Sequence, residues 1–204
     1  MILVGLTGSV GTGKTEVSKI FLRKNIPVFE SDRQVGIILQ KEKVKKNIKR
    51  HFPEAFEKET LVKKNLANIV FRDDKKLKTL ENIIYKNLRD MQAKWIRLQI
   101  TKRKKIAIFD VPLLFEKDNV FKYDFILVTT CSYSIQKVRV LKRKDWDYDR
   151  FTLTLKKQIR ENIKKKKANM IIHSDRGKRY AFNKVIKFLA LVEIKKRSTK
   201  EILR

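Results

Sequence analysis

The chain has 204 residues and a formal net charge of +29, from 51 Lys and Arg against 22 Asp and Glu. Its 42% of hydrophobic residues, with only 6 glycines and 3 prolines, exclude a disordered, collagen-like or turn-dense all-β chain. The length is enough for one α/β domain, or for one domain with a small lid. The single cysteine excludes an internal disulfide and a multi-cysteine metal site. The apolar runs are far shorter than a membrane span and the chain starts directly with a strand-like run, so we expect a cytoplasmic protein without a signal peptide or a membrane partner. We also expect a monomer.

The predicted elements alternate between strands and helices along the chain. Apolar residues at helical spacing predict a long helix that begins near Asp73 and Asp74, another helix entered through Ser132 or Ser134, and a C-terminal helix around Val185. Five short, nearly all-apolar runs are typical of strands covered on both faces, and the alternation predicts a parallel sheet with helices on both faces. These runs are Ile2–Leu6, Pro27–Phe29, Ile106–Val111, Phe125–Thr129 and Met170–Ile172.

The segment after the first strand, Gly8-Ser-Val-Gly-Thr-Gly-Lys-Thr15, fits the P-loop spacing G-x-x-x-x-G-K-[ST]. Glycines at these places let consecutive backbone N–H groups surround a phosphate, and the following helix adds its positive end. We expect Lys14 to reach the β- and γ-phosphates and the Thr15 hydroxyl to ligate Mg²⁺. The segment therefore predicts a site for a nucleoside triphosphate. The expected ATP-binding residues here are Gly8, Gly11, Thr12, Gly13, Lys14, Thr15 and Glu16.

Acidic residues end the second and third strands, at the sheet edge where ligands of open α/β sheets bind. Asp32 follows the second strand and is a candidate base for an acceptor hydroxyl, with Glu30 as the weaker candidate. Asp110 closes the third strand as a Walker-B carboxylate does, and we expect it to order the Mg²⁺ shell. For Asp32 and Asp110 the alternative is a capping role at the following helix.

Arg139 and Arg143 lie four residues apart and therefore share one face of a helix. They either clamp phosphates or face solvent, and the spacing alone favours neither reading. This helix leads into residues 145–167, a highly charged segment with sparse apolar positions that we interpret as a helical lid. Trp146 within it either contacts adenine or packs between lid and core.

The class of phosphoryl transfer follows partly by exclusion. The chain is too short for a motor-type ATPase and lacks the guanine-reading N-K-x-D of GTPases, so a small-molecule kinase remains. Basic runs at 41–50 and 156–167 are not interleaved with base-stacking aromatics, so we expect no dedicated nucleic-acid partner. His51 and His173 cannot build a zinc site, and Cys131 is interpreted as a core residue rather than a nucleophile.

Three of these segments closely resemble the dephospho-CoA kinase family: Gly5–Thr15, Val28–Asp32, and Asp110–Glu116 with its sequence Asp-Val-Pro-Leu-Leu-Phe-Glu. The last segment is specific to that family among P-loop kinases. The resemblance implies transfer of the γ-phosphate of ATP to the ribose 3′-hydroxyl of dephospho-CoA, the last step of coenzyme A synthesis. Further residues at the family's spacing are Arg139, Arg143, Gln158, Lys164 and Ala168.

The resemblance also implies a division of the chain and a set of roles. The P-loop core would comprise residues 1–32, 105–144 and 168–204, the helical CoA-side region residues 33–104, and the lid residues 145–167. Arg143 and Lys164 would be lid-side phosphate contacts. The residues expected to carry the chemistry are Lys14, Asp32, Asp110 and Arg139.

The chain departs from the family pattern at several positions, which bear on acceptor affinity and the adenine contact while leaving the phosphate chemistry intact. Two alternatives stay open. One is a P-loop kinase for another nucleotide or a small alcohol, and the other is an ATP-responsive protein that uses the +29 charge to bind nucleic acid. The departures are Tyr85-Lys86 for His-Pro, Glu30 for Asp, Thr154 for Arg, Arg160 for Pro and Ser174 for Asn.

Overall fold

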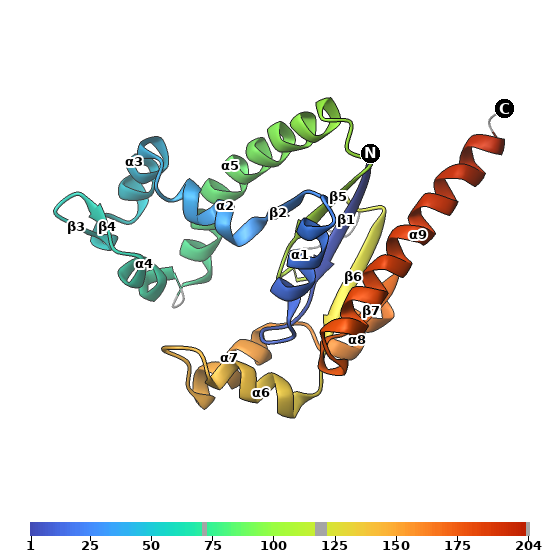
Figure 1. The fold of residues 1–204 in the computed structure, drawn as a ribbon. Coiled ribbons are helices and arrows are strands. Elements are labelled where there is room, and N and C mark those ends of the chain that lie inside the picture. Colours follow the sequence, from blue (N-terminus) through green and yellow to red (C-terminus); the bar gives the residue numbers. More distant parts are fainter. Residues whose placement is uncertain (71–72, 117–121, 203–204) are drawn as a thin grey trace. The chain divides into compact units, whose positions relative to one another are not determined.

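The structure is a computed structural model that describes residues 1–70, 73–116 and 122–202. The chain forms two compact units, the first made of Met1–Phe29 with Lys102–Arg204 and the second of Glu30–Thr101. The first unit contains the sheet with its covering helices, and the second is mostly helical (Figure 1).

The five-stranded sheet has the order β2-β5-β1-β6-β7. Strand β1 pairs in parallel with β5 and β6, and β6 pairs in parallel with β7. The parallel sheet predicted from the sequence is confirmed, and each predicted strand is present to within one residue at its ends. The strands are β1 Ile2–Thr7, β2 Val28–Glu30, β5 Ile106–Asp110, β6 Phe125–Thr130 and β7 Met170–His173.

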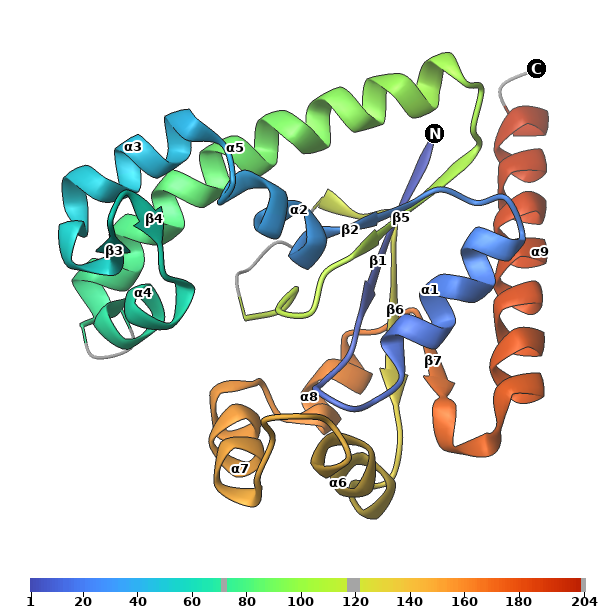
Figure 2. The same ribbon diagram turned by 60° about the vertical axis from the view of Figure 1, so that its left-hand side comes forward.

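One face of the sheet is covered by two helices, α1 Lys14–Arg23 and α9 Lys178–Ile202. The two helices contact each other and lie side by side in Figure 2, with the rings of Phe21 and Phe188 meeting edge to face at 6.4 Å. Successive residues of a strand point to opposite faces of the sheet. Leu127 of β6 points to this face and packs in the core cluster formed with these helices. Helices α1 and α9 therefore close one side of the core.

The other face carries a smaller apolar cluster. There Ile126 and Val128 of β6 pack against Leu114 and Phe115, which follow β5, and α8 Glu161–Lys166 lies against β6. Helices α6 Tyr133–Leu141 and α7 Tyr148–Lys157 lie between β6 and α8 along the chain. The segment interpreted as a lid is thus helical, as predicted.

The second unit is built around α5 Asp74–Thr101, the long helix that the apolar spacing predicts. Helices α2, α3 and α4 each contact α5. A two-stranded hairpin, β3 and β4, was not predicted; each strand has two residues, and its turn residues Lys58 and Glu59 have positive φ without being glycine, so no turn signal marks it. The other bounds are α2 Ser31–Ile38, α3 Glu42–His51, β3 Phe56–Glu57, β4 Thr60–Leu61 and α4 Lys63–Val70.

Candidate active site

The P-loop joins β1 to α1, and its glycines are required by backbone angle and by space. Gly11 and Gly13 have φ of 77° and 84°, in the left-handed region that other residues rarely adopt. A Cβ on Gly8 would collide with the hydroxyls of Thr12 and Thr129. Gly13 is the N-cap of α1 and no side chain caps the helix, which is typical of an anion-binding helix start.

Buried threonine hydroxyls hold the loop against β6. The Thr12 Oγ1 donates to the Ser9 carbonyl oxygen at 2.7 Å and lies 3.0 Å from the Thr129 Oγ1. The Thr129 hydroxyl is also 3.2 Å from the Thr7 carbonyl oxygen. Thr12 and Thr129 are both almost fully buried. In this structure the Thr12 side chain thus supports the shape of the loop.

Asp110, the last residue of β5, contacts two side chains of α1. Lys14 Nζ forms an ion pair with Oδ1, and the Ser18 Oγ donates to Oδ2 at 2.6 Å. Asp110 is only 6% exposed, and a carboxylate so buried needs such partners. The capping alternative for Asp110 is therefore wrong. Ser18 was missed by the sequence analysis, although it lies one helical turn after Lys14 and so shares its face of α1.

Arg139 of α6 lies beside the P-loop. Its Nη1 donates to the Ser174 Oγ at 2.7 Å and its Nη2 to the Ser174 carbonyl oxygen at 3.2 Å. A Cβ added to Gly13 would lie 3.4 Å from the same Nη1. The structure thus brings Arg139 to the start of α1, and Ser174, a departure from the family's usual Asn, holds it there.

Arg143 differs from Arg139 in its surroundings. It is exposed, and its guanidinium lies 5.9 Å from the centre of the Trp146 ring, while that of Arg150 lies 4.8 Å from the same ring. Trp146 therefore holds two arginines by cation–π contact at the end of α6. The two alternatives for Trp146, adenine contact and packing, stay predictions.

Thr15 and Glu16 are exposed in the first turn of α1. Glu16 Oε1 accepts from Lys19 Nζ at 2.7 Å, and this hydrogen bond lowers the pKa of Glu16. The Thr15 hydroxyl and the Asp110 carboxylate are oxygen donors of the kind that Mg²⁺ takes when substrate phosphates supply much of its shell, so the residues fit this ion. Within the described ranges, no three His, Cys, Asp or Glu side chains gather as a metal cluster.

Asp32 and Glu30 belong to the second unit and are placed at the start of α2. Glu30 is the N-cap and makes no side-chain capping bond. Asp32 lies inside the first turn and is exposed, and no hydrogen bond or ion pair joins its carboxylate to another described residue. The capping alternative for Asp32 is therefore wrong. Its role as a base stays a prediction.

Cys131 follows the last residue of β6 and lies against the P-loop. Its thiol is 3.8 Å from the Gly11 carbonyl oxygen, and burial raises the pKa of this thiol. A buried, protonated thiol is a poor nucleophile. The structure therefore agrees with the interpretation of Cys131 as a packing residue.

Lys164 is placed differently from the expected phosphate contact. Its side chain is fully buried in α8, where Nζ lies 2.8 Å from Glu116 Oε1, and the Glu116 side chain is 10% exposed. The lysine is thus part of a buried ion pair of the first unit and is not open to a ligand in this structure. Glu116 closes the Asp110–Glu116 segment that carries the family resemblance.

None of the helices in the described ranges combines the length and the apolar character that crossing a membrane requires.

Comparison with known proteins identifies the family. Residues 2–179 match the family model of dephospho-CoA kinase. The chain is 32% identical over 174 residues to the dephospho-CoA kinase of Bartonella quintana (strain Toulouse), an alignment that covers 85% of this chain and 89% of that protein.

Solved structures show the same fold. A protein from Thermus thermophilus has a TM-score of 0.83 at 24% identity, and the dephospho-CoA kinase from Campylobacter jejuni has a TM-score of 0.61 at 18% identity. Each comparison covers 93% of this chain and 96% of the other. Because the family model spans most of the chain and the P-loop, Asp110 and Arg139 are assembled as described, this chain is an enzyme of the dephospho-CoA kinase family.

Proposed function

We propose that the chain transfers the γ-phosphoryl group of ATP to the ribose 3′-hydroxyl of dephospho-CoA, giving coenzyme A and ADP. The observation that carries this proposal is the convergence of Lys14, Asp110 and Arg139 at the start of α1, in a chain of this family. A cytoplasmic location and a monomeric state stay predictions.

The residues divide the reaction between them. The acceptor oxygen attacks the γ-phosphorus, the bond from that phosphorus to the β–γ bridging oxygen breaks, and the hydroxyl proton passes to the Asp32 carboxylate. The cations of Lys14 and Arg139 stabilise the negative charge that accumulates on the transferring group, a role supported by their position at the start of α1. The Thr15 hydroxyl and Asp110 would hold Mg²⁺, which neutralises charge on the phosphate oxygens when bound.

A direct assay tests this proposal. ADP release from purified protein with ATP and Mg²⁺ should rise strongly when dephospho-CoA is added, and the product should carry one additional phosphate at the 3′ position. Turnover with a nucleoside monophosphate or a small alcohol, but not with dephospho-CoA, would favour the other kinase reading. ADP release stimulated by duplex or single-stranded nucleic acid would favour the nucleic-acid reading instead.

Arg139 and Arg143 should give different kinetic defects. Arg139 already lies beside Gly13, so Arg139→Ala should weaken ATP binding about 10- to 100-fold, the effect of losing hydrogen bonds to a charged group, with or without acceptor. Arg143 is exposed, so Arg143→Ala should lower kcat while ATP affinity without acceptor stays within about twofold. Calorimetric titration with ATP and steady-state kinetics measure both. Identical defects in the two variants would contradict this assignment.

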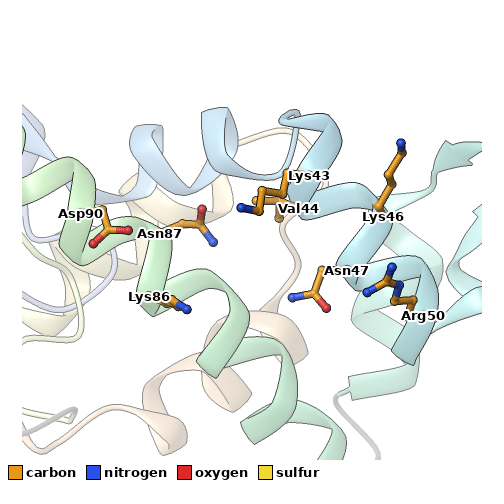
Figure 3. A pocket seen from close by; sticks show the side chains of 8 residues that line it. All are labelled: Lys43, Val44, Lys46, Asn47, Arg50, Lys86, Asn87 and Asp90. Carbon is orange, nitrogen blue, oxygen red and sulfur yellow. The ribbon is translucent and has the colours of Figure 1, made fainter.

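A basic pocket in the second unit is our candidate for the phosphates of the acceptor. It lies between α3 and α5 and has a volume of about 430 Å³ (Figure 3). Four cationic side chains and a single carboxylate, Asp90, line it; the cations are Lys43, Lys46, Arg50 and Lys86. No ion pair joins these four cations to any carboxylate in the described ranges, so an anion would gain their attraction. Lys86 belongs to the Tyr85-Lys86 departure from the family pattern.

Reversing one charge in this pocket should weaken binding of the acceptor and leave binding of ATP unchanged. We expect Lys86→Glu to raise the KM for dephospho-CoA about three- to tenfold while the KM for ATP is unchanged. An exposed charge contact contributes roughly 1 kcal/mol or less, and reversing the charge replaces an attraction by a repulsion, so the change in binding free energy is about twice that contribution. Lys75→Glu, an exposed lysine of α5 outside the pocket, is the matched control with the same change in net charge. Equal effects of the two substitutions would reject the pocket.

A further inference from the structure

Two glutamine side chains hold the Val10 backbone in the middle of the P-loop. The Val10 N–H donates to Gln158 Oε1 at 3.1 Å, and the Val10 carbonyl oxygen accepts from Gln136 Nε2 at 2.6 Å. Gln136 is buried in α6, whereas Gln158 is half-buried in the short link between α7 and α8. The loop is therefore held both by α6 and by the link between α7 and α8, which lies within the lid segment.

The link that carries Gln158 is itself fastened to the segment after β5. Glu116 Oε1 accepts from the Ile159 backbone N–H at 2.9 Å and lies 2.8 Å from Lys164 Nζ. The Ile159 side chain packs against the apolar cluster on that face of the sheet. The residue after Gln158 and the helix that follows are thus tied to one carboxylate.

The energetics of this ion pair favour a positional role over a stabilising one. A buried ion pair is often no more stabilising than an apolar pair of the same volume, because both charges lose their hydration. Here Glu116 Oε2 and Lys164 Nζ are buried without a directed hydrogen-bond partner among the described residues. The pair therefore gains little as a source of stability. What it does supply is a fixed direction for the chain between α7 and α8.

We propose that Gln158 is a positioning residue of the P-loop, and that the Glu116–Lys164 pair acts on ATP binding through it. The inference rests on the proposed role of the P-loop in binding ATP. With the Val10 N–H already satisfied, this part of the loop is ordered before ATP arrives, and binding need not supply the free energy of ordering it. The link between α7 and α8 is then a fixed part of the lid segment that contacts the P-loop.

Gln158→Ala tests the first half of this proposal. Losing one net hydrogen bond should raise the Kd for ATP about three- to tenfold. Amide hydrogen exchange of residues 8–13 in the ATP-free protein should become faster, while the melting temperature falls by no more than about 2–4 °C. Gln40→Ala, an exposed glutamine without a side-chain hydrogen bond among the described residues, should change none of these quantities.

The charge-neutral double variant Glu116→Gln with Lys164→Met tests the second half. It leaves an acceptor for the Ile159 N–H and an apolar stem in α8, so it avoids the uncompensated charge that would destabilise either single variant. The hydrogen bonds and ion pairs of Glu116 and Lys164 go to α8 and the link, and not to the P-loop. Any effect on ATP must therefore pass through the link. We expect the double variant to raise the Kd for ATP by a factor similar to that of Gln158→Ala. When the double variant is combined with Gln158→Ala, the Kd should be less than about twofold higher than in Gln158→Ala alone.

Two results would overturn the proposal. One is an unchanged Kd and unchanged exchange in Gln158→Ala. The other is a double variant whose effect on the Kd for ATP is fully additive with Gln158→Ala, since independent effects cannot run through one residue. Both measurements use ATP alone. They can therefore succeed even if dephospho-CoA proves not to be the acceptor, and failure of the proposed function is seen separately in the ADP assay.

Discussion

Lys14→Ala should lower kcat by ~10² or more, because it removes a fixed cation from the place where charge develops on the transferring phosphoryl group. The same change also takes the cationic partner from Asp110, which is 6% exposed and keeps the hydrogen bond from the Ser18 hydroxyl. An uncompensated buried carboxylate is destabilising, so the melting temperature should fall as well. Coupled measurement of ADP release and a thermal melt record the two effects.

A second variant separates these two effects. Lys14→Ala combined with Asp110→Asn removes both charges of the buried pair, so it should recover most of the melting temperature while activity stays at least ~10²-fold down. Arg23→Ala, which removes an exposed cation from the last turn of the same helix, is the matched control and should keep the kcat of the unmodified protein. A folded Lys14→Ala variant with near-normal kcat would reject the P-loop assignment.

The sheet was predictable because its signal is local. Each strand is a short apolar run, because a strand that is buried on both faces does not alternate apolar and polar residues. All five residues of β5, for example, are buried. The strand order β2-β5-β1-β6-β7 could not be predicted from these local patterns, because it depends on which segments distant in the sequence pair with one another. The hairpin β3–β4 was missed for the opposite reason: it is local but carries neither glycine nor a strand pattern.

Site residues could be predicted where the spacing of a motif determines their place in the P-loop. Their interaction partners could not, where those partners are distant in the sequence. Lys14 follows from the P-loop spacing, but its pairing with Asp110 joins residues 96 positions apart. Lys164 was interpreted as a phosphate contact from family spacing, although it is buried beside its partner Glu116. The carboxylate of Glu116 lies in the quoted motif, so the opposite charges were visible while their proximity was not.

Asp32→Asn should separate chemistry from binding most clearly. Asn keeps the size of the side chain and one acceptor oxygen but cannot take the proton of the acceptor hydroxyl. We expect normal binding of ATP and Mg²⁺, binding of dephospho-CoA within a few-fold, and a loss of ~10²–10⁴ in kcat. Because phosphoryl transfer passes through a loose transition state, positioning of the hydroxyl shares this loss with proton removal.

The controls follow from where Asp32 lies. It is exposed in the first turn of α2 and is bonded to no other described side chain, so Asp32→Asn should leave the melting temperature unchanged. Asp74→Asn, which changes an exposed aspartate in the first turn of α5, is the matched control and should keep full kcat. If Asp32→Asn melts and turns over as the unmodified protein does, the catalytic role is rejected, and Glu30 and Asp110 become the next candidates for the base.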